Sequence, residues 1–230
     1  MEIGRHPTAF TGATLLAVLL VAALVAPYLG TVDPLELSPI KRLRPPGEEY
    51  WFGTDPLGRD IYSRVLYGAR VSLMVGFAVA LAATAAGLAI GLVAGFHRLS
   101  DAILMRVMDG LMAIPPILLA IALMALTRAS LGNVILAITI AEVPRVTRLV
   151  RSVVLGLRAQ PVVEAARAAG TPGWRILLRH ILPNTVPPLI VQATYICASA
   201  IIIEAILSFL GAGMPPNVPS WGHIIAEGRN

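Results

Sequence analysis

Long uninterrupted apolar segments constrain the fold of this chain more than any other feature of its sequence. A helix needs about 20 apolar residues to cross the hydrocarbon core of a bilayer. The segments that reach this length are Thr8–Leu29, Val71–Phe96, Ile103–Leu126, Leu131–Leu157 and Val186–Leu210. Of the 230 residues, 57% are hydrophobic and 13% are charged, whereas a soluble domain has about 25% charged residues. The sequence therefore predicts an all-α, polytopic transmembrane helical bundle with five spans.

The first apolar segment, Thr8–Leu29, is predicted to stay in the protein as a helix. Arg5 and His6 precede it and small residues lie within it, as in a signal peptide. Its apolar run is longer than the roughly 7–15 residues of a signal-peptide core. Arg5 predicts a cytoplasmic N-terminus, because basic residues concentrate on that side of the membrane.

The polar segment Thr31–Arg70 is predicted to be an external loop, since its acidic and basic residues balance. Its first half is rich in proline and is expected to be extended. From Asp55 onward we expect a separate short helix along the membrane surface, with Asp55 as N-cap and Asp60 paired with Arg64. The apolar stripe of this helix would contain Leu57, Ile61, Val65 and Ala69.

Two patterns predict how the next spans pack. Gly87, Gly91 and Gly95 form a ladder of small residues that allows another helix of the same chain to approach closely. Pro115-Pro116 interrupts the third segment, which predicts a broken helix. Arg106 and Asp109, one turn apart, are expected to satisfy each other.

Arginines cluster between the fourth and fifth apolar segments. Seven arginines and Glu164 give residues 145–179 a net charge of +6, which predicts a cytoplasmic region. The arginines are Arg145, Arg148, Arg151, Arg158, Arg167, Arg175 and Arg179. The first three recur at every third position, as in a voltage sensor, so a voltage-sensing module is an alternative.

The segment Pro161–Pro183 within this region predicts two short helices joined by a sharp corner. Pro161 suits a first helical residue and Gly170 suits the left-handed position after a helix end. Thr171 is the expected N-cap of the second helix, which Pro183 should end or kink. Several alanines keep the first helix thin, so that another surface could approach it.

The motifs of this segment resemble the EAA loop of ABC importer permeases, the cytoplasmic docking element for separate ATP-hydrolysing subunits. Glu164-Ala165-Ala166, Gly170 and Leu182-Pro183 match the spacing of that loop. The run from Arg179 to Asn184 is similar to the dipeptide/oligopeptide/nickel branch, and so is the run from Met105 to Pro115. A signature before the second span also resembles this branch; its residues are Gly53, Thr54, Asp55, Gly58, Arg59 and Asp60.

The resemblance implies a C-type permease subunit with the fold of the ABC importer permeases (MetI-like). Such a subunit moves dipeptides, oligopeptides or a related small solute across the bacterial inner membrane. Its implied partners are a second homologous permease, two cytoplasmic ATPases and an external substrate-binding protein. The residues implied in coupling to the ATPases are Glu164, Ala165, Ala166, Gly170, Arg179, Leu182 and Pro183.

The expected organisation is a first transmembrane helix (1–30), an external loop with a surface helix (31–70) and a permease core (71–230). The core contains the coupling loop (158–183). The resemblance calls for a sixth span, and the tail from Gly211 to Asn230 has no apolar run long enough to supply it. We therefore expect an incomplete permease whose fifth helix leaves the surroundings of Glu204 exposed to lipid or to a vacant groove.

The sequence contains no recognisable catalytic chemistry. Lys41 is the single lysine, and no Gly-Lys-Ser/Thr run for a phosphate-binding loop includes it, so ATP and Mg²⁺ are expected on partner subunits. The histidines lack metal-ligand spacing. Asp109, Glu142 and Glu204 are acidic residues within apolar segments, which predicts buried polar or translocation-path positions. The same acids would serve an ion-coupled secondary transporter, which is the alternative function.

Overall fold

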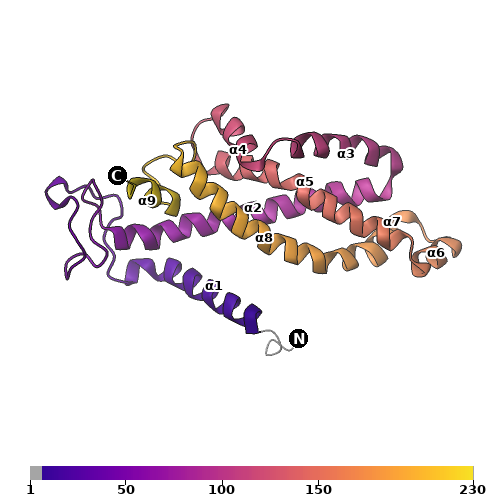
Figure 1. Cartoon of the computed structure of the whole chain (residues 1–230). Helices are drawn as coiled ribbons and strands as arrows, with labels where there is room; N and C mark the ends of the chain where they lie inside the picture. Colours follow the sequence, from indigo (N-terminus) through magenta and orange to yellow (C-terminus); the bar gives the residue numbers. More distant parts are fainter. Residues whose placement is uncertain (1–6, 230) are drawn as a thin grey trace. The chain divides into compact units, whose positions relative to one another are not determined.

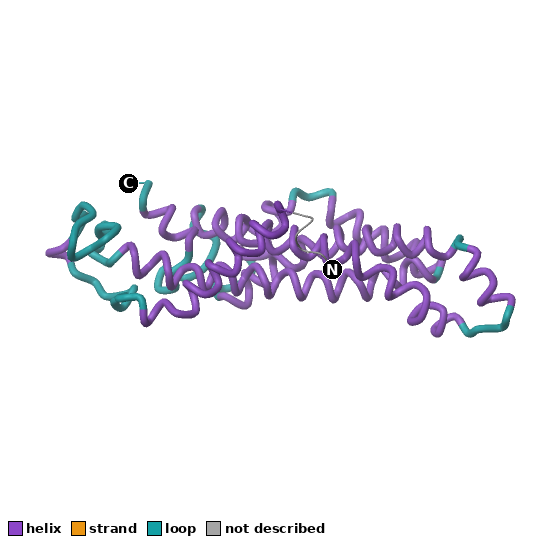
Figure 2. The backbone as a smooth tube through the Cα atoms, turned by 90° about the horizontal axis from the view of Figure 1, so that it is seen from below, coloured by secondary structure: helices purple, strands orange, loops and turns teal. Residues whose placement is uncertain are grey.

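The structure, a computed structural model, describes residues 7–229, and these residues form helices without a β-strand (Figures 1 and 2). The long helices are α1 (Pro7–Val25), α2 (Ile61–Phe96), α3 (Arg98–Met112), α4 (Pro116–Ala125), α5 (Leu131–Arg158) and α8 (Leu182–Phe209). The short ones are η2 (Ala26–Tyr28), η3 (Pro39–Lys41), α6 (Pro161–Ala168), α7 (Gly173–Ile176), the π-helical turn η4 (Leu177–Ile181) and α9 (Trp221–Glu227). Arg5 and His6, on which the orientation of the N-terminus depends, lie outside the described residues.

Three helical stretches in residues 7–229 are long and apolar enough to cross a membrane: Pro7–Tyr28, Ile61–Phe96 and Gly173–Phe209. The pair α3 and α4 adds a fourth if it is counted as one bent span. Helix α5 has 28 residues, but Glu142, Arg145 and Arg148 reduce its apolar character. The helical membrane architecture is thus confirmed, with polar residues concentrated on the fourth of the five predicted spans.

The described chain divides into two compact units, one of residues 7–74 with 204–229 and the other of residues 75–203. In the first unit, the guanidinium of Arg70 on α2 donates to the carbonyls of Ala23 and Leu24 at the end of α1. The carbonyls of the last turn of an α-helix lack the usual α-helical partners. Arg70 therefore caps α1 and attaches it to α2.

The predicted surface helix after Asp55 is wrong. Residues 56–60 form a turn, and α2 begins at Ile61 and continues without a break into the predicted second span. The Asp55 carboxylate accepts the backbone N–H groups of Leu57 and Arg59, which stabilises the turn. Asp60 is the residue that caps α2, because its carboxylate accepts the backbone N–H of Ser63 at 2.9 Å.

In the second unit, the glycine ladder of α2 packs against α5, as predicted. A Cβ atom at Gly91 would lie 2.7 Å from the Cβ of Val150, and one at Gly95 would lie 2.6 Å from the Cβ of Val154. Gly87 meets Val146 in the same way. The three valines are buried, so each glycine receives one valine of the facing helix.

Helix α3 is held to α5 by ion pairs. Asp109 binds Arg148 at 2.7 Å, and Asp101 binds Arg151 through both carboxylate oxygens. The expected pair of Asp109 with Arg106 is therefore wrong, because the carboxylate of Asp109 is directed toward α5. Arg148 and Arg151, two of the three arginines whose spacing resembles a voltage sensor, are therefore paired with acidic residues of α3.

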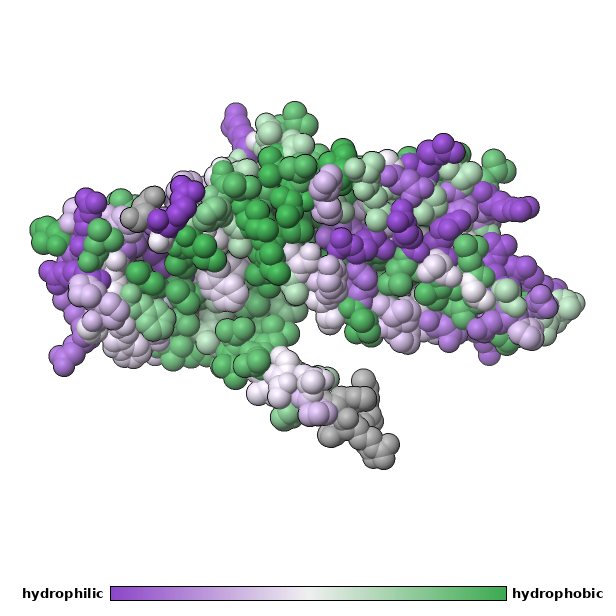
Figure 3. All heavy atoms as spheres, in the orientation of Figure 1, coloured by the Kyte–Doolittle hydropathy of each residue, from purple (hydrophilic) through white to green (hydrophobic). Residues whose placement is uncertain are grey.

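The predicted break at Pro115-Pro116 is confirmed. Helix α3 ends at Met112, α4 begins at Pro116, and their axes differ by 87°. A residue before proline avoids the helical region, and Pro115 has an extended ψ of 135°. Apolar side chains cover the surface at α4, whereas hydrophilic ones gather over α3 and the neighbouring part of α5 (Figure 3).

Candidate functional site

The first candidate site is the segment around α6 at one end of the second unit (Figure 1). Helix α6 begins at Pro161, as predicted, and Gly170 has a φ of +75°. The N–H of Gly170 donates to the carbonyl of Arg167, and the N–H of Thr171 donates to that of Ala166. These two bonds form a Schellman motif, which requires the left-handed conformation that glycine adopts without strain.

One buried side chain anchors α6, and most of its other residues remain accessible. Val163 is 1% exposed, while Glu164, Ala165 and Gly170 are exposed and Ala166 is half-buried. Large apolar side chains flank this surface and are also exposed, namely Val162, Trp174 and Leu178. The loop thus presents a small-residue helix with an apolar border to its surroundings.

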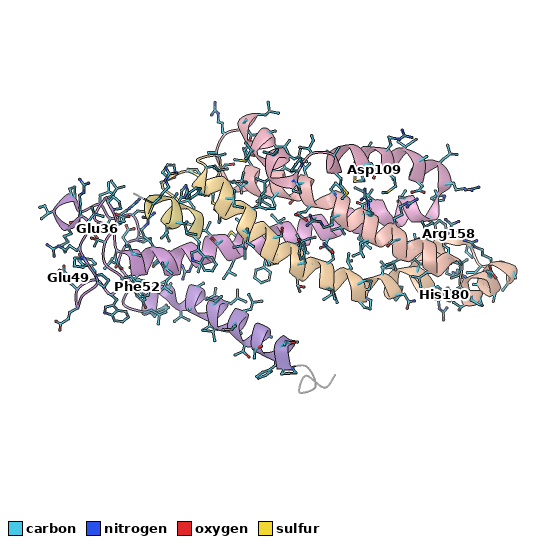
Figure 4. All side chains as sticks on the ribbon, in the orientation of Figure 1. Glu36, Glu49, Phe52, Asp109, Arg158 and His180 are labelled. Atoms are coloured by element: carbon cyan, nitrogen blue, oxygen red, sulfur yellow. The ribbon has the colours of Figure 1, made fainter. Side chains whose placement is uncertain are left out.

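The base of this loop is attached to the end of α2. Arg158 donates to the carbonyl of Gly95 at 2.7 Å, and its guanidinium lies 5.6 Å from the centre of the Phe96 ring. Gly173 contacts the same ring, because a Cβ at this glycine would lie 3.0 Å from it. Figure 4 shows Arg158 and His180 at this end of the second unit.

The expected second short helix is different in the structure. Pro172, rather than Thr171, is the N-cap of α7, and it makes no side-chain capping bond. Pro183 does not end the helix: α7, η4 and α8 form one 37-residue helical stretch, Gly173–Phe209. Proline lacks an N–H and crowds the preceding turn, and the π-helical turn ends at Ile181, two residues before Pro183. Such a turn accommodates the disturbance without breaking the helix.

The remaining predicted coupling residues lie on this continuous stretch. Arg179 and Pro183 are exposed, and Leu182 is half-buried. Ile176 and Ile181 are buried and hold the stretch in the unit. The predicted coupling residues therefore form two groups, one on α6 and one at the start of the long helix, with the Gly170 corner between them.

Glu142 on α5 is buried within the second unit, as predicted. Its side chain is 1% exposed and pairs with Arg145 at 2.9 Å. The hydroxyl of Ser199 on α8 lies 3.5 Å from the same carboxylate. The ring of Tyr195 lies 5.4 Å from the Arg145 guanidinium, so α5 and α8 share a polar cluster.

Glu204 on α8 is also buried, as predicted, and is 0% exposed. It accepts hydrogen bonds from Ser208 at 2.8 Å and from Ser72 of α2 at 3.4 Å. Close packing of Gly222 against Ser208 also covers this region. The expectation that the surroundings of Glu204 are exposed without a sixth span is therefore wrong.

Asp109, the third predicted buried acid, is exposed. Its side chain retains 57% of its accessible surface, and its partner Arg148 retains 51%. Figure 4 shows Asp109 on α3. This position contributes a surface ion pair between two helices of the second unit, so Asp109 is not a buried residue, and its place on a translocation path stays a prediction.

The signature before the second span forms a tight, buried structure in the first unit. Gly53 and Gly58 have φ values of +75° and +76°, and Thr54 forms a β-bridge with Asp60. A Cβ at Gly58 would collide with the backbone carbonyl of Ser38. Both glycines are therefore required for the fold of this segment.

Sequence reasoning missed the ionic network built on this signature. Asp55 pairs with Arg59 at 2.6 Å and with Arg64, and both arginines also pair with Glu227 of α9. The expected Asp60–Arg64 pair is wrong, because Arg64 is occupied by Asp55 and Glu227. The sequence did contain a signal for this network, because several charged residues lie within a few positions of an apolar span and buried charges need partners of opposite charge.

This network changes the acidity of its carboxyl groups. Burial alone raises the pKa of Asp55, but hydrogen bonds from the backbone and side chain of Arg59 outweigh burial and hold that pKa below its ordinary value. Burial likewise opposes ionisation of Glu227, and hydrogen bonds from Arg64 and Arg59 lower its pKa. Both groups are therefore stabilised as carboxylates.

Comparisons with known proteins agree with the motifs. Residues 87–229 match the family model for the binding-protein-dependent transport system inner membrane component. A probable peptide ABC transporter permease of Sinorhizobium fredii is 55% identical over 98% of this chain and 77% of its own. A dipeptide transport system permease of Alkalihalophilus pseudofirmus is 42% identical over 99% of this chain and 75% of its own.

A solved structure shows the same fold. The MetNI methionine ABC transporter, in an inward-facing conformation, matches 64% of this chain and 74% of its own chain with a TM-score of 0.55. The identity is 22%, so this likeness concerns the fold alone. The relatives do not support the ion-coupled transporter. The protein is a multi-pass inner-membrane permease without catalytic function, and ATP hydrolysis takes place on a separate subunit. The chain belongs to the family of binding-protein-dependent transport system inner membrane components, as a permease subunit of an ABC importer.

Proposed function

We propose that this chain is the C-type permease subunit of an importer for dipeptides or oligopeptides. Relatives at 55% and 42% identity are named as peptide and dipeptide permeases and support this substrate class. The observation that carries the mechanism is the exposed helix α6, closed by a Schellman motif at Gly170 and followed by one 37-residue helical stretch.

In this proposal α6 inserts into a groove of a cytoplasmic ATPase. Its exposed alanines allow close approach of the two backbones, and Trp174 and Leu178 contribute apolar contact at the border. Closure of the ATPases on ATP would move α6, and the corner at Gly170 would pass this motion to the continuous stretch Gly173–Phe209. ATP and Mg²⁺ belong to two such ATPase subunits.

The remaining partners are a second homologous permease and an external substrate-binding protein. The arginine-rich region 145–179 faces the cytoplasm in this arrangement, and the segment 31–60, which has four basic and six acidic residues, faces outward. The N-terminus then lies in the cytoplasm, since α1 crosses once before that external segment. We also propose that the polar cluster of Glu142, Arg145 and Tyr195 lines the translocation path. Tyr195 lies on the membrane-crossing stretch Gly173–Phe209, and its side chain is exposed next to Arg145.

The test is a Gly170→Val variant in proteoliposomes that contain the partner permease, the ATPases and the binding protein. A β-branched residue at a φ of +75° is strained and should disorder the corner. We expect normal membrane insertion with loss of peptide uptake and of binding-protein-stimulated ATP hydrolysis. Gly156→Val is the matched control, because this glycine is helical and has open space around it.

Uptake by Gly170→Val equal to that of Gly156→Val would show that the corner does not couple the subunits. Competition between labelled dipeptides and free amino acids in the same vesicles tests the substrate class. If the vesicles take up a solute in an ATP-dependent way but do not take up dipeptides or oligopeptides, the coupling proposal stands and the peptide proposal fails.

A further inference from the structure

The three arginines that recur at every third position of α5 differ in how their guanidinium groups are used. Arg148 and Arg151 bind carboxylates of α3. Arg145 binds a residue of its own helix, since its Nη1 donates to the two oxygens of Glu142 at 2.9 and 3.3 Å. The other two nitrogens of Arg145, Nε and Nη2, make no hydrogen bond within residues 7–229.

This unused edge of the Arg145 guanidinium is open to solvent. The side chain retains 36% of its accessible surface, and neither Nε nor Nη2 is among the buried polar atoms of residues 7–229 that lack a partner. Glu142 is 1% exposed and occupies the Nη1 end of the guanidinium. A ligand can therefore reach Nε and Nη2 without displacing Glu142.

The geometry of this edge selects a carboxylate. The N–H groups of Nε and Nη2 point in parallel and match the two oxygens of a carboxylate group. Arg151, two turns further along α5, shows this arrangement, because its Nε and Nη2 donate to the two oxygens of Asp101. Arg145 offers the same pair of donors without an occupant within residues 7–229.

The ion pair with Glu142 does not prevent a second carboxylate from binding. Arg59 in the first unit binds two carboxylates at once, Asp55 through Nε and Glu227 through Nη2. Because Glu142 already serves Arg145 as a permanent counter-ion, the fold does not require another. The free edge of Arg145 therefore suits a carboxylate that binds and leaves.

Tyr195 of α8 holds the guanidinium in place and extends the site. Its ring centre lies 5.4 Å from the Arg145 guanidinium, and its side chain is 56% exposed. Contact with an aromatic ring and the ion pair with Glu142 restrict the arginine, so that binding a ligand costs less conformational entropy. The exposed part of the ring offers an apolar surface to the group that carries the carboxylate.

We propose that Arg145 binds the C-terminal carboxylate of a transported peptide through Nε and Nη2, while Tyr195 contacts the adjoining peptide unit. This inference rests on the proposed function and adds a specificity-determining residue to it. Peptides with a free C-terminal carboxylate bind to this site in preference to peptides whose C-terminus is an amide.

The experiment measures equilibrium binding of radiolabelled alanyl-alanine to the purified complex of the two permeases and the ATPases. The binding protein is omitted, because it would hold the peptide itself. Unlabelled alanyl-alanine, N-acetyl-alanyl-alanine and alanyl-alaninamide are the competitors. We expect the first two to compete at similar concentrations and the amide to require a roughly 10- to 100-fold higher concentration, as for loss of a charge-assisted hydrogen bond.

Variants connect this preference to Arg145. Arg145→Gln should abolish it, and the double variant Glu142→Gln with Arg145→Gln should do the same without leaving a buried carboxylate unpaired. Tyr195→Leu alters an exposed side chain, so the fold is kept, and should weaken binding of alanyl-alanine roughly 2- to 30-fold. Arg148→Gln is the matched control, because this arginine lies one turn away on α5 and pairs with α3, and it should keep the preference.

The proposal is overturned if alanyl-alaninamide competes as well as alanyl-alanine, if the labelled peptide does not bind, or if the variants at Arg145 keep the preference for a free carboxylate. Loss of the second permease from complexes of both Arg145 variants would assign the free edge to a carboxylate of that subunit and would also overturn it. Failure here leaves the importer proposal intact, because peptide uptake is measured separately in proteoliposomes.

Discussion

Arg64, near the beginning of α2, forms an ion pair with Glu227 of α9 across 163 residues of sequence. Glu227 also binds Arg59, and the indole N–H of Trp221 donates to the carbonyl of Val65 at 3.1 Å. The signature before the second span, the start of α2 and the seven-residue helix α9 are therefore fastened together within the first unit. A helix this short has little stability of its own, so its position depends on these contacts.

We predict that Glu227→Ala releases α9. The replacement removes one of the two carboxylate partners of the buried Arg59 and Arg64 and should cost about 1.5–3 kcal/mol, the range for hydrogen bonds to charged groups. Hydrogen exchange of the amides of residues 221–227 should accelerate while α1 remains protected. Glu36→Ala, which removes an exposed carboxylate, should leave the exchange unchanged. Unaltered exchange in Glu227→Ala would show that packing alone holds the helix.

The same network predicts loss of stability in acid. Hydrogen bonds outweigh burial at Asp55 and Glu227, and both folded pKa values lie below the ordinary ones. Because the unfolded chain binds protons more readily, this stabilisation is present above the unfolded pKa values of about 4 and disappears as pH falls through the folded values. Tm should fall below about pH 5, and the fall should be shallower in Asp55→Asn. An equal slope in both proteins would contradict this assignment.

The glycine ladder makes a prediction about packing in the second unit. A Cβ at Gly91 would lie 2.7 Å from Val150 and 2.9 Å from the carbonyl oxygen of Thr147. Gly91→Val should force α2 and α5 apart and cost about 1–3 kcal/mol or more, seen as a lower Tm. Gly110→Ala, in open space on α3, should be neutral or stabilising by up to about 1 kcal/mol. A double variant with Val150→Ala should recover part of the loss.

Glu204 should be required as a hydrogen-bonding group in a buried site. Glu204→Leu leaves the hydroxyls of Ser72 and Ser208 without this partner and should cost about 1–3 kcal/mol. Glu204→Gln keeps the shape and an acceptor, so it should retain most of the stability. Equal Tm values for the two variants would indicate that the cavity accepts any side chain of that volume. Comparison of detergent-solubilised full chains by thermal unfolding distinguishes these outcomes.

Sequence reasoning was most successful where the controlling interactions are local or periodic. Gly170 is confirmed in a left-handed conformation because a helix end imposes that geometry within a few residues. The glycine ladder and the break at Pro115-Pro116 are confirmed for the same reason. The buried positions of Glu142 and Glu204 follow from the cost of exposing a carboxylate to lipid.

The errors concern competition between alternative partners, which are local at Asp60 and distant in the sequence at Asp109. Asp60 was expected to pair with Arg64, but its carboxylate binds Ser63. Asp109 was expected to pair with Arg106, but its carboxylate binds Arg148 of α5. Asp55 was expected to start a helix, yet its carboxylate stabilises a turn and Asp60 takes the capping role. The coupling role of α6 stays a prediction, because it concerns subunits that this chain does not contain. The domain boundaries also stay predictions.

The π-helical turn before Pro183 also has a consequence for helical phase. Each residue turns an α-helix by about 100°, and a π turn accommodates one residue more than the surrounding helix. Side chains on either side of residues 177–181 are therefore out of register with a straight α-helix. Deleting one residue there would restore regular winding and keep the α7 side chains in their present orientation relative to α8. Rewinding the turn as α-helix with all its residues kept would rotate Trp174 and Arg175 by about 100° relative to α8, so their orientation depends on the π turn.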